Sequence, residues 1–126
     1  MVTDNISCML VDIKNHTLSG RVDLEVPFSK TNVSIAKILE NEGYLSKVKV
    51  IDENKKQMIE LSLGDKRLLD IKRISRPGRR YYAKNNEIPR PKGGAGFVIL
   101  STNNGLMTGH DAQKKGLGGE VICEVF

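Results

Sequence analysis

The chain has 126 residues, with 20 lysine and arginine side chains against 15 aspartate and glutamate side chains, and its formal net charge is +5. This length fits one small protein or two very small lobes, and an apolar fraction of 39% is sufficient for a packed core. The longest apolar runs have only four residues, whereas a membrane span needs about 20, so we expect no membrane insertion. The first fifteen residues do not resemble a signal peptide, so we expect a cytoplasmic protein.

The first two predicted elements are a helix and a strand. Apolar residues recur at helical spacing near the start of the chain, at Ile6, Met9, Leu10 and Ile13. The next pattern has period two, because apolar and charged residues alternate from 21 to 26 before Pro27. We therefore predict a helix followed by a half-buried strand.

A second helix and three strand candidates follow. Ser29 or Thr31 can accept backbone N–H bonds at the start of this helix, and Gly43 fits its C-terminal end. The strand candidates are residues 44–51, 57–63 and 68–74. The order predicts an N-terminal α/β lobe over residues 1–74, with both helices on one face of a small sheet, and the fold class is α+β.

Residues 75–80 read as a basic connection between two lobes, because Pro77 and Gly78 break any continuing strand. The C-terminal lobe, residues 81–126, is predicted to be mainly β. Its clearest signal is the segment 97–107, in which Asn104-Gly105 separates two apolar runs and favours a tight turn. Residues 109–115 can form a short helix, and 121–126 read as a final strand.

The positive charge is concentrated in the second half of the chain. Residues 1–68 hold ten basic and ten acidic side chains, whereas residues 69–126 hold ten and five. Between positions 72 and 92 there are eight basic side chains against Glu87 alone, and five of the eight are arginine. A solvated basic face is the simplest explanation of such a run. Because arginine binds phosphate in bidentate geometry, and Tyr81 and Tyr82 interrupt the run, we favour nucleic acid as the partner.

Catalytic and metal-binding patterns are not found in the sequence. The two histidines, His16 and His110, are not spaced with Cys8, Cys123 or paired carboxylates as a metal site requires, and we expect both cysteines to be free thiols. The glycine-rich residues 93–96 precede a predicted strand, whereas a phosphate-binding glycine loop opens a helix. We expect no enzyme activity, no metal, no cofactor and no small-molecule substrate.

A run of short polar side chains suits RNA. Ser101, Thr102, Asn103 and Asn104 can hydrogen-bond to 2′-hydroxyls, phosphates and exposed base edges, although an ordinary hairpin turn explains the same residues. Glycines at positions 105, 118 and 119 would let backbone amides approach another chain closely, or serve simple turns.

Four separated motifs in one order give the sequence a specific resemblance. They are Arg73-Ile74-Ser75-Arg76-Pro77-Gly78-Arg79-Arg80-Tyr81-Tyr82, then Glu87-Ile88-Pro89, then residues 101–108 and residues 116–123. With the first helix and the segment Val26 to Lys30, they closely resemble the bacterial-type family of small-subunit ribosomal protein number eight. The segment 109–114 departs from the commoner family pattern.

The resemblance implies a structural protein that binds the central domain of small-subunit rRNA and helps its folding and assembly. Its partners would be that rRNA and neighbouring ribosomal proteins, on a cytoplasmic or an organelle ribosome. The alternative is a translational regulator that binds its own operon messenger RNA through the same site. The RNA-binding candidates are Ser101, Thr102, Asn103, Asn104, Gly105, Tyr82, Glu120, Arg76, Arg80, Lys84 and Lys30.

Overall fold

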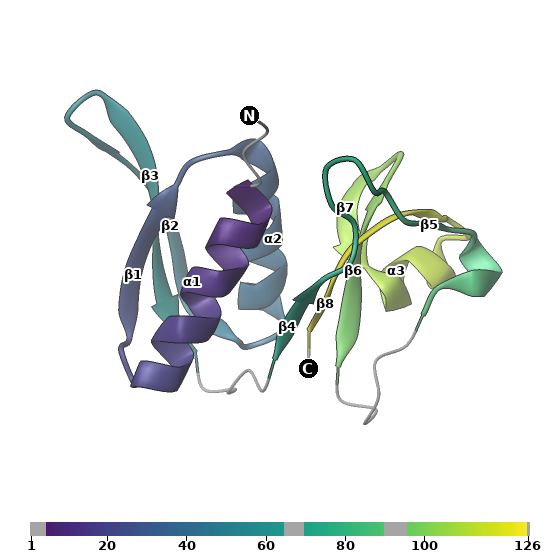
Figure 1. Ribbon diagram of the computed structural model, residues 1–126, viewed down its shortest axis with the longest axis horizontal. Coiled ribbons are helices and arrows are strands. Elements are labelled where there is room, and N and C mark those ends of the chain that lie inside the picture. Colours follow the sequence, from purple (N-terminus) through teal and green to yellow (C-terminus); the bar gives the residue numbers. More distant parts are fainter. Residues whose placement is uncertain (1–4, 65–69, 90–95, 126) are drawn as a thin grey trace. The chain divides into compact units, whose positions relative to one another are not determined.

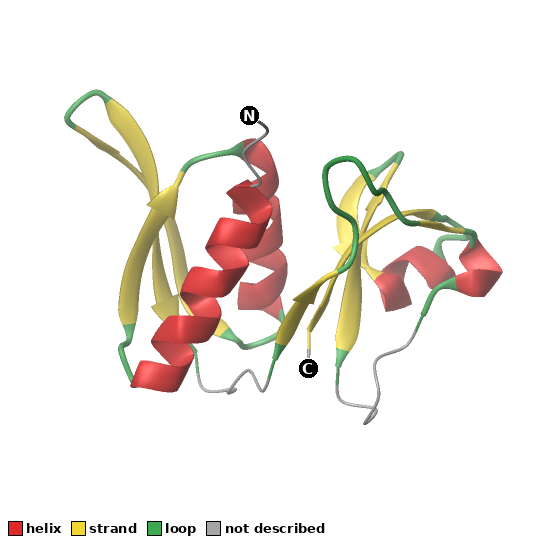
Figure 2. Cartoon of the chain, viewed as in Figure 1, coloured by secondary structure: helices red, strands yellow, loops and turns green. Residues whose placement is uncertain are grey.

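The computed structural model describes residues 5–64, 70–89 and 96–125, and the chain forms two compact units that divide near residue 69 (Figure 1). The first contains two helices and a three-stranded sheet, and the second a five-stranded sheet with one short α-helix (Figure 2). The predicted α+β fold class is confirmed. No helix in the described ranges is long and apolar enough to cross a membrane.

The two helices of the first unit are α1 (Asn5–Ser19) and α2 (Lys30–Asn41). Helix α2 begins where predicted, because the Ser29 side chain accepts a hydrogen bond from the Asn32 backbone N–H at 3.0 Å. Gly43 follows its C-cap residue Glu42, has a φ of +91° and donates its N–H to the Glu40 carbonyl oxygen, while Tyr44 donates to that of Leu39. These two bonds form a Schellman motif, for which glycine is the favoured residue.

The sheet of the first unit has the order β1-β3-β2, with β1 (Asp23–Pro27), β2 (Leu45–Glu53) and β3 (Lys56–Leu63) all antiparallel. A two-residue turn joins β2 to β3, and Asn54 and Lys55 both have positive φ there, as a type I′ turn requires. Helix α1 packs against β1 and α2 against β2. Most of the predicted inward residues are confirmed, since the buried side chains include Met9, Leu10, Ile13, Leu24, Val26, Ile35, Leu39, Ile59 and Leu61. The prediction is wrong for Val22, which is 59% exposed because it precedes the first paired residue of β1.

The second unit is mainly β, as predicted. Its sheet has the order β4-β8-β6-β7, and β5 also pairs with β8. The elements are β4 (Ile71–Arg73), β5 (Tyr82–Ala83), the 3₁₀ helix η1 (Asn85–Glu87), β6 (Phe97–Thr102), β7 (Gly105–Thr108), α3 (Gly109–Lys114) and β8 (Gly119–Val125). One face of the sheet packs on α3 through a small core of Ala83, Val98, Leu100, Met107, Ala112 and Val121.

The short helix α3 is held at both ends by side chains. The Thr108 side chain accepts a hydrogen bond from the Asp111 backbone N–H at 3.2 Å and so caps the N-terminus. The Asn85 side-chain amide donates to the carbonyl oxygens of Ala112 and Leu117, both at 3.2 Å. A side chain outside the helix therefore satisfies carbonyl groups at its C-terminal end.

One strand lies elsewhere than the sequence indicates. The sequence pattern predicts residues 68–74 as the last strand of the N-terminal lobe, but β4 pairs with β8, with Ile71 opposite Val125 and Arg73 opposite Cys123. Only three residues form this strand, and its hydrogen-bonding partner is about fifty residues away in sequence. Period-two alternation predicts a strand without saying which sheet it joins. The segment 75–80 consequently lies within the second unit.

Candidate nucleic-acid interface

Three of the candidate residues form a row across the second sheet. Glu120 on β8 lies opposite Ser101 on β6 and opposite Tyr82 on β5. Directly opposed residues of antiparallel strands share one face, so the three side chains lie side by side. Their chain neighbours Leu100, Val121 and Ala83 point to the opposite face and form the small core. The core therefore fixes the side of the sheet on which the row lies.

The Tyr82 ring is the most exposed member of this row, with 70% of the residue accessible to solvent. A tyrosine ring offers a flat face for stacking on a base. At the other end of the row, the Ser101 hydroxyl makes no hydrogen bond within the part of the chain that the structure describes. The row thus presents a stacking face and a hydroxyl group, separated by a carboxylate.

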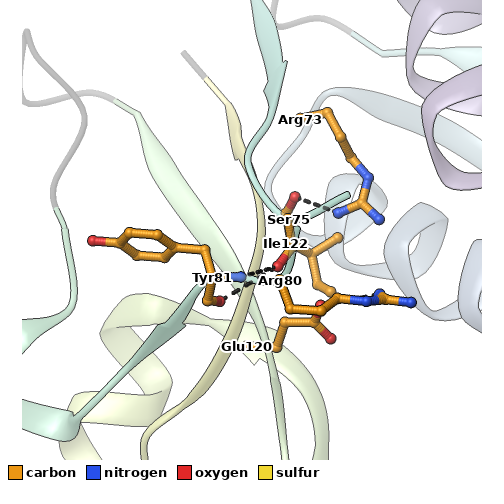
Figure 3. Close-up of polar contacts among 6 residues, drawn as sticks. All are labelled: Arg73, Ser75, Arg80, Tyr81, Glu120 and Ile122. Atoms are coloured by element: carbon orange, nitrogen blue, oxygen red, sulfur yellow. Dashed lines mark hydrogen bonds and ion pairs between the residues drawn. The ribbon is translucent and has the colours of Figure 1, made fainter. Parts of the chain in front are cut away.

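The carboxylate of Glu120 is held by Arg80. The Arg80 guanidinium donates to Glu120 Oε2 at 3.1 Å, while 17% of the Glu120 side chain and 48% of the Arg80 side chain remain exposed (Figure 3). This contact neutralises the one acidic group of the row and draws Arg80 to its edge. The ion pair therefore connects the polar row to the basic segment of residues 75–80.

The polar turn next to Ser101 shapes itself through Thr102. The Thr102 hydroxyl donates to the Gly105 carbonyl oxygen at 2.8 Å and accepts from the Asn104 backbone N–H at 3.1 Å. Gly105 has a φ of +103°, in the region that favours glycine, while Asn103 and Asn104 lie exposed at the tip. Thr102 therefore maintains the shape of the turn, whereas the side chains of Ser101, Asn103 and Asn104 remain available to a partner.

Gly119 is required because of a close approach inside the protein. A Cβ atom at this position would lie 2.1 Å from the Ser101 carbonyl oxygen, and one at Gly118 would lie 2.6 Å from the Ala83 carbonyl oxygen. From the sequence alone, one interpretation of these glycines is that they let the backbone approach another chain closely. Their backbone is instead crowded by neighbouring segments of the same unit, so both glycines serve the fold.

The basic segment contains a closed turn. Arg76 and Arg79 exchange two backbone hydrogen bonds, of 3.1 and 2.9 Å, around Pro77 and Gly78, whose φ is +81°. Proline followed by a glycine of positive φ is the sequence of a type II turn. The buried Ser75 hydroxyl accepts the Tyr81 backbone N–H at 2.6 Å and so ties the two ends of the segment together (Figure 3). The sequence does not predict this role of Ser75.

The remaining candidates are more scattered. Lys84 is exposed and follows β5 directly, in the same unit as the row. Lys30 is exposed at the first residue of α2, in the other unit. The structure therefore brings Ser101, Glu120, Tyr82 and Arg80 together on the second unit, next to the polar turn, whereas Lys30 belongs to the first unit.

The cysteines and histidines form no metal-binding arrangement in the described ranges, where no group of three metal-ligating side chains occurs. Both cysteines are free thiols, as expected. Burial raises the pKa of Cys123 to about 12, and the nearby positive charge of Arg73 only partly opposes this. The thiol therefore stays protonated and unreactive near neutral pH.

Comparison with known proteins gives one family over the whole length. The model of the family described as Ribosomal protein S8 matches residues 4–126. Small ribosomal subunit protein uS8 of Dictyoglomus turgidum is 46% identical over 129 aligned residues, which cover 99% of this chain and 98% of that protein. The uS8 proteins of Caldanaerobacter subterraneus subsp. tengcongensis and Thermodesulfovibrio yellowstonii are 43% and 40% identical, and each match covers 100% of this chain.

Proposed function

The chain belongs to the ribosomal protein S8 family, and from that premise we propose that it binds the central domain of small-subunit rRNA and helps this RNA to fold during assembly. As a small-ribosomal-subunit protein it is a structural component, not an enzyme, with rRNA and ribosomal proteins as partners. The observation that best supports the proposal is the row of Ser101, Glu120 and Tyr82, which adjoins a polar turn and is linked to Arg80.

The row and the turn supply the contacts that distinguish one RNA from another. The Ser101 hydroxyl and the amides of Asn103 and Asn104 can bond to 2′-hydroxyls and to base edges in an internal loop, and Tyr82 can stack on an unpaired base. Thr102 and Gly105 contribute indirectly, because they hold the turn in shape. Glu120 accepts N–H groups, either from Arg80 or from a base.

Basic side chains supply the second kind of contact. Arg76, Arg80 and Lys84 are exposed in the same unit as the row, so they can bind backbone phosphates while the row binds bases and sugars. Lys30 would add a phosphate contact from the first unit. Phosphate contacts position a protein on a nucleic acid but carry little sequence information. We therefore assign affinity mainly to the basic residues and specificity mainly to the row and the turn.

Footprinting of the purified protein on small-subunit rRNA tests the proposal. We expect protection of one contiguous site within the central domain at protein concentrations that leave the other domains unprotected. Protection spread evenly over all the domains would contradict it. Co-sedimentation with small subunits complements this experiment, because an off-ribosome regulator of messenger RNA would not sediment with them.

A further inference from the structure

An open hollow of about 460 Å³ lies beside the turn formed by residues 76–79. This turn is distant in sequence from the polar turn of residues 101–105. The hollow is lined by Lys72, Arg73, Ile74, Arg76, Arg79, Arg80 and Tyr81. Five of these seven residues are cationic, and none of the lining residues in the described part of the chain is acidic. Arg80 is paired with Glu120, and an anion that enters the hollow gains interactions with several cations at once.

Two of the cations are fixed in direction by the strand β8. The Arg73 guanidinium donates to the Ile122 carbonyl oxygen at 2.7 Å, and that of Arg80 contacts Glu120 at 3.1 Å. Figure 3 shows both guanidinium groups extending to the same side, whereas the Tyr81 ring points away from them. Side chains that are already held lose less conformational entropy when a ligand binds. A solvated run of basic residues would have no such arrangement.

The turn itself sets the position of two more cations. Arg76 and Arg79 pair through their backbones across Pro77 and Gly78, and the Ser75 hydroxyl closes the segment by accepting the Tyr81 N–H. Ser75 is completely buried, so this bond is protected from competition with water. The hollow therefore has a defined shape as well as a charge.

We propose that this hollow binds a phosphate group of the RNA backbone, with Ser75 as the residue that positions its arginines. Arginine guanidinium groups match phosphate oxygens in bidentate geometry, and Ile74 supplies an apolar wall against which the adjoining sugar can pack. The inference rests on the proposed RNA-binding function and gives two of the phosphate-binding residues named there, Arg76 and Arg80, one defined anion site. The same cations would also bind free inorganic phosphate, which provides a simple probe.

The test is a titration of inorganic phosphate into the full-length protein at constant ionic strength, followed by NMR. We expect saturable shifts of the Ile74 and Tyr81 backbone amides and of the Arg73 and Arg80 side-chain Nε–H signals. The double variant K72Q/R76Q changes two exposed lining residues and should weaken phosphate binding at least about tenfold, since hydrogen bonds to charged groups are the strong ones. The variant K37Q/K49Q removes the same charge from exposed positions of the first unit and should bind phosphate like the parent.

Shifts spread over the basic residues of both units, or equal weakening in the two variants, would overturn the proposal. A central-domain rRNA fragment is then added to the phosphate-saturated protein, and we expect it to displace the phosphate. RNA that binds while phosphate remains in the hollow would overturn the assignment to the RNA backbone. RNA that does not bind at all, with phosphate binding intact, would instead overturn the proposed function and leave a site for free anions.

The Ser75→Ala variant tests the positioning role separately. It should lose phosphate affinity while keeping all five cations, and Ser75→Thr should restore part of that affinity because it retains the hydroxyl group. Spectra of both variants without ligand show whether the second unit stays folded. If the folded Ser75→Ala variant bound phosphate with unchanged affinity, the positioning role would be wrong.

Discussion

The Thr102 hydroxyl bonds across its own turn to the Gly105 carbonyl oxygen at 2.8 Å, so it is already engaged before any RNA binds. It also accepts the Asn104 N–H. Its neighbour Ser101 has no such bond within the described residues and faces the row with Glu120 and Tyr82. Two adjacent hydroxyl groups in one motif therefore have different tasks, one of shape and one of contact.

This difference predicts distinct effects of two substitutions at Thr102. Thr102→Val removes both turn hydrogen bonds, so the Asn104 amide should exchange its proton with solvent faster and the free energy of unfolding should fall by about 0.5–1.5 kcal/mol. Thr102→Ser keeps the hydroxyl group and should retain the protection. Hydrogen exchange followed by NMR measures both, and equal exchange rates at Asn104 in the two variants would show that Thr102 does not shape the turn.

The burial of Leu61 predicts that this side chain contributes strongly to the free energy of unfolding of the first unit. Leu61 is completely buried in β3, between Leu24 and Val48 on the neighbouring strands. Leu61→Ala should therefore lower the free energy of unfolding by about 2–5 kcal/mol in chemical denaturation. The matched control is Val50→Ala on β2, since Val50 is 42% exposed and its loss should cost less than about 1 kcal/mol. Similar losses at the two positions would contradict the assignment of the core.

The two thiols should differ in reactivity. Cys8 is exposed, whereas Cys123 is buried with its pKa raised to about 12. At pH 8 an alkylating reagent should label Cys8 in the folded protein and both residues in denaturant, which mass spectrometry of the peptides distinguishes. The unfolded chain loses the Cys123 proton above about pH 8.5, so the stabilising contribution of this protonated thiol falls as the pH rises from there through about 12. Rapid native labelling of Cys123 at pH 8 would contradict its burial.

Arg76 and Arg80 of the basic segment should contribute to the salt dependence of RNA binding. When both Arg76 and Arg80 are replaced by alanine, fewer RNA phosphates are neutralised in the complex. The plot of log affinity against log salt concentration should therefore become less steep, by roughly 0.7 to 0.9 for each phosphate that the variant no longer neutralises. Binding is measured at several salt concentrations with the same rRNA fragment. An unchanged slope would mean that these arginines form only a solvated face.

Much of the fold follows from local patterns in the sequence. Some features depend only on residues a few positions apart in the sequence. They are the apolar stripe of α1, the Ser29 cap, Gly43 at the end of α2 and the turn before Gly105. The sequence predicts the strand that contains β4 but places it in the wrong sheet, and it does not predict β5. The two strands have three and two residues, and their pairing with β8 depends on contacts far apart in sequence.

The sequence suggests the residues of the candidate site but not how they are arranged. The motifs named Ser101, Glu120 and Tyr82, but their alignment depends on the register of β6, β8 and β5. The pairing of β6 with β8 includes an irregularity between Ile99 and Leu100, which the sequence pattern does not predict. The ion pair from Arg80 to Glu120 likewise joins residues forty positions apart. In the sequence Ser75 cannot be distinguished from other loop serines. Its burial and its hydrogen bond to the Tyr81 N–H are seen only in the structure.

The most direct measurement of the central claim compares the affinities of two RNAs for the Ser101→Ala variant. If the Ser101 hydroxyl bonds an RNA group that becomes buried, its removal should weaken binding to the central-domain rRNA fragment by about 1–3 kcal/mol, roughly ten- to a hundredfold. Weak binding to an unrelated duplex, and its salt slope, should stay unchanged, because phosphate attraction does not select one RNA. Ser19→Ala, at the exposed end of α1, is the control and should bind both RNAs like the parent. An unchanged affinity of Ser101→Ala for the rRNA fragment, or equal losses on the two RNAs with the fold intact, would contradict the account.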